Sequence, residues 1–202
     1  MSREERAITW NDVLSMVDYE AVRKERRAAI SKIKRNRRVE VGPFATFYFE
    51  SYDTMWYQVH EMLYIERGGA EQIEAELAAY NPLIPRGREL VATLMLEISD
   101  PARRDRILAT LGGIERMISL GLDGESISGL PRGEGERTNE AGKTSSVHFL
   151  YFPFGADQIV KFRAPGTRIT LGFAHENYGH IAVVPEAVRQ VLAADFDAAA
   201  SS

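Results

Sequence analysis

The chain contains no cysteine and no long apolar run among its 202 residues. The missing sulfur excludes disulfide bonds, thiolate zinc sites, iron–sulfur clusters bound through the chain's own thiolates, and a cysteine nucleophile. No stretch approaches the roughly 18 uninterrupted apolar residues of a membrane-spanning helix. The first residues carry charge without an apolar segment behind them, which is unlike a secretory signal. We therefore expect a cytoplasmic protein with no membrane segment.

The composition is that of an ordinary folded protein, with 45% hydrophobic and 27% charged residues. A chain of this length buries roughly 70% of its unfolded surface, so one core can stabilise it without metal or disulfides. We expect a single domain over residues 1–202, with a frayed tail at residues 196–202 rich in alanine and serine.

Local patterns predict a mixture of helices and strands. Helices are expected at residues 19–35, after a cap at Ser51 or Asp53, and at residues 70–80. Strands are expected at residues 39–50, with a bend at Gly42, and at residues 89–98. Hairpins are expected at residues 117–130 and 168–184. This order predicts the α+β class: one domain with a mainly antiparallel sheet packed against helices, and a basic helix near the N-terminus.

The near-neutral net charge of −4 conceals an uneven distribution. Between Arg23 and Arg38 lie nine basic residues and only one acid, Glu25, for a local charge of +8. The rest of the chain then holds 16 Lys and Arg against 28 Asp and Glu, for a charge of −12.

Two interpretations of this basic segment stay open. Clustered lysine and arginine can neutralise the phosphates of a nucleic acid. The simpler interpretation is a solvated helix whose basic side meets the acidic remainder of the chain or an acidic partner. A binding platform for a single-stranded nucleic acid requires aromatic residues on which the bases stack, and the basic run contains none. The second interpretation is therefore favoured.

Two histidines close together suggest a metal site. If residues 176–179 form a four-residue hairpin loop, His175 and His180 lie directly opposite each other. Opposed residues of an antiparallel pair have Cβ atoms roughly 4.5–5.5 Å apart, close enough for two imidazoles to share one ion. A slip of one residue in register would send the two side chains to opposite faces.

The expected metal site takes further ligands from elsewhere in the chain. His60 lies on an apolar helix, with Glu61 beside it and Glu66 expected to return towards the buried stripe. Glu97 follows the face of a buried strand, and a carboxylate in a core position must be paired, protonated or bound to metal. The predicted ligands of a divalent iron or zinc ion are therefore His60, Glu61, Glu66, Glu97, His175 and His180. The alternative is that the histidines cap a turn and bond backbone carbonyls.

Several phrases together resemble one family: Val41-Gly42-Pro43, Tyr80-Asn81-Pro82, Gly112-Gly113-Ile114-Glu115, Val147-His148-Phe149-Leu150 and Asn177-Tyr178-Gly179-His180. Over about residues 8–195 the chain resembles an uncharacterised bacterial family, the domain of unknown function three-five-zero-one. The resemblance implies no reaction and no catalytic residues. It implies the company of a rubrerythrin-like protein and an iron–sulfur oxidoreductase, and so a link to redox or oxidative-stress metabolism.

Two functional hypotheses follow. The first is an accessory or metal-binding protein of a bacterial redox system, with a non-heme site of histidine and carboxylate ligands. The second is a non-catalytic protein that docks an acidic partner or nucleic acid through the segment between Arg23 and Arg38. An oligomeric scaffold without a site is the third interpretation, and whether the chain is an enzyme stays open.

Overall fold

The computed structural model describes residues 2–132, 138–139 and 142–197, and the predicted frayed tail lies largely outside them. Over these residues the chain forms helices and two antiparallel sheets, which confirms the predicted α+β class. The helices are α1 (Met16–Arg35), α2 (Tyr52–Glu66), α3 (Ala70–Tyr80), α4 (Pro101–Leu108), α5 (Ala156–Arg163) and α6 (Glu186–Ala193), with short 3-10 turns at Trp10–Asp12, Asn81–Leu83 and Ile114–Arg116. In the described part of the chain no helix is long and apolar enough to cross a membrane.

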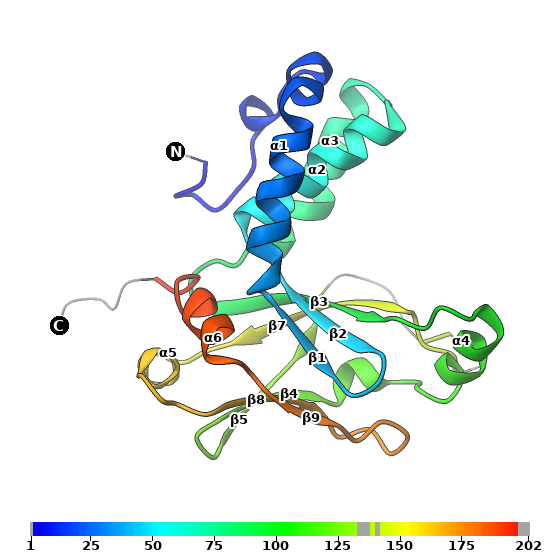
Figure 1. Cartoon of the computed structure of the whole chain (residues 1–202), viewed down its shortest axis with the longest axis vertical. Helices are drawn as coiled ribbons and strands as arrows, with labels where there is room; N and C mark the ends of the chain where they lie inside the picture. Colours follow the sequence, from blue (N-terminus) through cyan, green and yellow to red (C-terminus); the bar gives the residue numbers. More distant parts are fainter. Residues whose placement is uncertain (1, 133–137, 140–141, 198–202) are drawn as a thin grey trace.

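The two sheets form the body of the molecule (Figure 1). The first sheet has the order β1-β2-β3-β7-β6, from strands β1 (Arg38–Val41), β2 (Ala45–Phe49), β3 (Glu89–Leu96), β7 (Val147–Pro153) and β6 (Leu130–Pro131). The second has the order β5-β4-β8-β9, from β5 (Glu125–Ser128), β4 (Ile118–Leu122), β8 (Ile169–Phe173) and β9 (Ile181–Val183).

The core lies between the sheets because alternate residues of each strand project to one face. Phe47, Leu94 and Leu150 of the first sheet are buried in one cluster with Leu120 and Leu171 of the second. Helices α5 and α6 close one end of this body, and α4 lies at the other end (Figure 1). The predicted strand at residues 39–50 is a hairpin, because Gly42 adopts φ +71° and turns the chain back between β1 and β2.

Helices α1, α2 and α3 pack side by side and stand away from the sheets, and we call them the helical arm (Figure 1). A second, smaller apolar cluster anchors the arm. It joins Met55 and Val59 of α2 to Val91, which projects from the outer face of β3. The arm therefore leaves the sheet body on the side opposite the main core.

Local signals set the ends of the arm helices. Ser51 accepts the Thr54 N–H at the start of α2, and the Thr54 hydroxyl accepts the Ser51 N–H in return. Helix α2 ends at Glu66, where the C-cap residue Arg67 has a left-handed φ of +54°, and Gly69 follows with φ +78°. The basic segment forms the last three to four turns of α1 and continues into β1, so the sequence places it where the arm joins the body.

Candidate functional site

The predicted ligands His60 and Glu61 both lie on α2 in the arm, but each is already bonded. The buried His60 ring accepts the Leu14 N–H at Nε2, at 3.0 Å, so Nδ1 donates to the Trp56 carbonyl at 2.7 Å. Burial lowers the pKa of His60 and favours this neutral ring. The Glu61 carboxylate accepts two hydrogen bonds of 2.8 Å from Arg23, which hold its pKa below the usual range.

His175 and His180 are not opposed, and this prediction is wrong. His175 forms a bridge with Tyr178, and the Phe173 N–H donates to the His180 carbonyl. The turn is two residues shorter than expected, because His175 Nδ1 accepts the Asn177 N–H at 3.1 Å and tightens it. The other ring nitrogen lies 3.2 Å from the Gly112 carbonyl, which makes His175 a turn-capping residue, whereas the half-buried His180 ring packs on Tyr178.

Glu66 and Glu97 are exposed, which corrects the expectation that they occupy core positions. Helix α2 ends at Glu66, so its buried stripe stops before that residue, and the carboxylate accepts a hydrogen bond from Gln72. Strand β3 ends at Leu96, and Glu97 beyond it accepts hydrogen bonds from Thr46 and Tyr48.

The six predicted ligands therefore lie in separate places. His60, Glu61 and Glu66 belong to the arm, whereas Glu97, His175 and His180 belong to the sheet body. Among the residues that the structure describes, no three histidine, aspartate or glutamate side chains are grouped so that they could hold a metal ion. Metal binding stays a prediction, and the arrangement directs attention to the basic segment instead.

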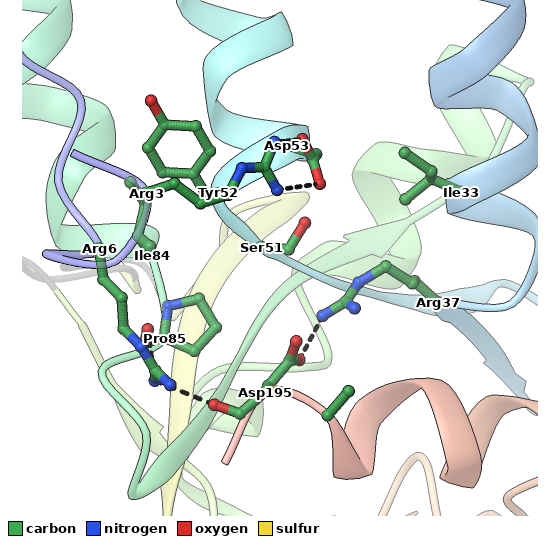
Figure 2. Close-up of a pocket in the computed structure, with 11 residues that line it drawn as sticks. Arg3, Arg6, Ile33, Arg37, Ser51, Tyr52, Asp53, Ile84, Pro85 and Asp195 are labelled. Carbon is green, nitrogen blue, oxygen red and sulfur yellow. Dashed lines mark hydrogen bonds and ion pairs between the residues drawn. The ribbon is translucent and has the colours of Figure 1, made fainter. Parts of the chain in front are cut away.

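A polar pocket of 230 Å³ lies on one side of α1 at the junction of arm and body, and we call it the junction pocket (Figure 2). Three arginines line it, and each faces an acidic or carbonyl oxygen. Arg3 pairs with both oxygens of Asp53, and Arg6 donates to the backbone carbonyl of Asp195 and to the Asp197 carboxylate. Arg37 pairs with the Asp195 carboxylate.

The pair of Arg37 and Asp195 is the most buried ion pair at this junction, with side chains 6% and 12% exposed. Arg37 also donates from Nε to the Phe49 carbonyl and from Nη2 to the Glu50 carbonyl, so three acceptors hold its guanidinium in place. Burial raises the pKa of Asp195, and the Arg37 charge opposes that rise. The junction pocket thus ties the end of α1, the N-terminal segment and the segment after α6 together, and its cations already have anionic partners.

The basic segment divides into paired and unpaired cations. Arg23, Arg37 and Arg38 form ion pairs with Glu61, Asp195 and Glu40 respectively. Within the described residues the remaining six form no ion pair, although Arg26 lies over the Trp56 ring at 5.2 Å. We call the other five the basic face, although by the helical repeat Arg27 and Lys34 lie on the same stripe of α1 as Arg23: Lys24, Arg27, Lys32, Lys34 and Arg35.

Three residues of the basic face, Arg27, Lys34 and Arg35, border a hollow of 510 Å³, which we call the basic groove. Helix α1 forms one wall, while Tyr57 of α2 and Tyr48 of β2 come from neighbouring elements. No acidic residue of the described chain is among those that line it, namely Arg27, Ile30, Ser31, Lys34, Arg35, Arg38, Tyr48 and Tyr57. Three of its four cations, Arg27, Lys34 and Arg35, form no ion pair in the described chain, although Glu97 and Glu61 lie beside Tyr48 and Tyr57.

The two tyrosines are the groove residues that the sequence analysis missed. No aromatic residue lies inside the basic run, and folding brings Tyr48 and Tyr57 to the run from β2 and α2. Burial raises the pKa of both phenols, with nearby Glu97 and Glu61 acting in the same direction. Both tyrosines therefore stay protonated and add neutral hydroxyl groups to a cationic site. The signal in the sequence was the alternation along β2, which places Tyr48 on the face opposite Phe47.

Comparison with known proteins places the chain in a family. A crystal structure of a novel protein of unknown function from Burkholderia pseudomallei K96243 is similar, with a TM-score of 0.87 and 36% sequence identity. The match covers 95% of this chain and 100% of that one, so the two share the whole architecture. No curated protein matches the chain. The model of the family described as protein of unknown function (DUF3501) matches residues 7–196, which agrees with the expected span, and the chain therefore belongs to the DUF3501 family.

Proposed function

We propose that this protein is a non-catalytic binding protein that docks an acidic protein partner through the basic face of α1. The observation that carries the proposal is the set of five cations, Lys24, Arg27, Lys32, Lys34 and Arg35, that have no ion pair in the described chain although the molecule as a whole is acidic. Their opposite charge would steer an acidic surface towards the arm and orient it there.

The shape of the basic face favours a protein over a nucleic acid. The five cations extend along about 17 Å of one helix, at a rise of about 1.5 Å per residue, which matches a short acidic helix or loop. A nucleic acid extends its charge in both directions, and beyond the segment between Arg23 and Arg38 it would meet residues whose charges sum to −12. A compact acidic surface avoids that repulsion.

The family resemblance suggests which proteins to test first. The rubrerythrin-like protein and the iron–sulfur oxidoreductase that it implies would link the docking to redox or oxidative-stress metabolism in the cytoplasm. In that system the chain would act as an accessory protein, because it has no cysteine with which to hold a cluster through its own thiolates.

The experiment compares one neutralised pair with a matched pair elsewhere. Lys34→Gln with Arg35→Gln removes two charges of the basic face, and Arg103→Gln with Arg106→Gln removes two exposed charges of α4 at the far end of the body. Fluorescence anisotropy would measure binding to the two candidate proteins, to a labelled glutamate-rich helical peptide and to a labelled DNA duplex over a range of salt.

We expect the basic-face pair to weaken binding of the acidic peptide and of a true partner about tenfold, which corresponds to about 1.4 kcal/mol. The α4 pair should leave that binding almost unchanged, and added salt should weaken it because exposed charges are screened. Tighter binding of the DNA duplex than of every acidic protein at the same salt would replace the partner by a nucleic acid. Equal binding by both variants would refute the role of the basic face.

A further inference from the structure

The basic groove has more positive charge than a single carboxylate of a partner can neutralise. Arg27, Lys34, Arg35 and Arg38 all line this one hollow, and only Arg38 has an acidic neighbour, Glu40, within ion-pair distance. Arg27, Lys34 and Arg35 therefore form no ion pair within the described chain. This is unlike the junction pocket on the other side of α1, where each of the three arginines already faces an anionic or carbonyl oxygen (Figure 2).

The donors around the groove suit a phosphate ester. A phosphomonoester carries a charge of about −1.5 to −2 at pH 7 and three acceptor oxygens, and a guanidinium fork can bind two of those oxygens at once. Arg27 and Arg35 provide such forks one on either side of Ser31, whose hydroxyl also lines the groove. Ile30 and the rings of Tyr48 and Tyr57 provide an apolar surface that the carbon atoms of the ester can contact.

We propose that the basic groove is a binding site for a phosphomonoester dianion, presented as a phosphorylated side chain of the docked partner. The assignment of the phosphate to a side chain of the partner rests on the proposed function, since the groove is part of the face that would meet that partner. The anion site itself does not depend on a partner, so it can be tested on the isolated chain.

The test is a titration of the ¹⁵N-labelled full chain followed by its backbone amide signals. The probes are N-acetyl-O-phosphoserine amide, N-acetylglutamate amide and adenosine monophosphate, each at constant ionic strength. We expect saturable shifts centred on Ser31 and Lys34, with the phosphoserine probe binding at least tenfold more tightly than the glutamate probe. Affinity should fall as the pH drops from about 7 to about 5, because the second phosphate proton binds with a pKa of about 6.

Two paired variants separate the groove from the rest of the basic face. Arg27→Gln with Arg35→Gln removes the two guanidinium forks that have no ion pair in the described chain and should abolish the saturable shifts. Lys24→Gln with Lys32→Gln removes two face charges that do not line the groove, and should leave phosphoserine binding within about twofold while it weakens the acidic partner.

Equal affinity for the glutamate and phosphoserine probes would overturn the phosphate assignment, as would an unchanged titration of the Arg27 and Arg35 variant. Tighter binding of adenosine monophosphate than of phosphoserine would overturn the partner's side chain as the source and assign a nucleotide. Phosphoserine binding without any binding of an acidic protein would refute the proposed function but leave the anion site in place.

Discussion

The two sides of α1 use the same kind of residue in opposite ways. On the side of the junction pocket, Arg37 is buried against Asp195, and its charge holds the arm to the segment after α6. On the other side, Lys34 and Arg35 lie three and two residues before Arg37 in the sequence and form no ion pair in the described chain. A basic run in a sequence can therefore contain both cations that form ion pairs within the fold and cations that do not. The elements that pack against each residue decide which of the run's charges are paired in the fold, since Glu61 of α2 meets Arg23 and Asp195 after α6 meets Arg37.

The largest expected effect comes from removing the anion of the junction pocket. Asp195→Ala leaves the Arg37 charge buried without its carboxylate, and such a loss costs about 3–5 kcal/mol of folding free energy. Urea unfolding of the full chain measures it. Asp197→Ala is the control, because the Asp197 side chain is 60% exposed and its pair with Arg6 should contribute at most about 1 kcal/mol. Equal losses in the two variants would show that the buried pair is no more structural than an exposed one.

A smaller effect separates two carboxylates by their response to acid. Hydrogen bonds from Arg23 lower the pKa of Glu61, so its ionised form stabilises the fold above its ordinary pKa of 4.5 and loses that contribution as the pH falls. Burial raises the pKa of Asp195, so the folded chain binds this proton more readily, and its contribution changes in the opposite direction just above 3.8.

Urea midpoints between about pH 3 and pH 7 test this pair of signs. Glu61→Gln should lower stability at neutral pH but lose less of it on acidification than the parent chain does. Asp195→Asn should lose more on acidification than the parent, because the proton that favours the folded state has no place to bind. Parallel pH profiles for both variants would contradict the opposite directions of the two pKa shifts.

The sequence predicted the local elements well because their signals are local. Ser51 caps α2 as expected, and the hairpin expected at residues 117–130 is the pair of β4 and β5. The basic helix was also expected, and its paired members agree with the simpler interpretation of the run. Caps and turns depend on residues within a few positions of one another, so they can be read from one segment.

The candidate site was predicted less well, because it depends on contacts between distant segments. The prediction of opposed histidines is wrong because the turn closes between His175 and Tyr178. The Tyr178 hydroxyl donates to the carbonyl of Val41, which lies 137 residues away in the sequence. Tyr48 and Tyr57 reach the basic groove only through the packing of β2 and α2 beside α1. No spacing within the basic run could have revealed either arrangement.

The smallest expected effect is the one that most sharply tests the contrast between the two sides. Lys34→Gln with Arg35→Gln removes two charges, twice as many as Asp195→Ala, yet should change the folding free energy by no more than about 0.5 kcal/mol. Two opposing contributions produce this result. Cations in the last turn of α1 stabilise the helix through a favourable interaction with its dipole. Here the same cations also repel Arg27 and Arg38 around the basic groove.

Urea unfolding at low and at high salt tests this balance, because salt screens both contributions and should leave the difference near zero. A loss of more than about 2 kcal/mol would mean that Lys34 and Arg35 hold the arm together as Arg37 does. In that case the groove would be a structural contact, and its charges would not be available to a ligand. If this variant instead keeps its folding free energy but loses about tenfold in binding, Lys34 and Arg35 act in binding and not in folding. Arg37, two residues further along the chain, would then stabilise the fold while Lys34 and Arg35 contact the partner.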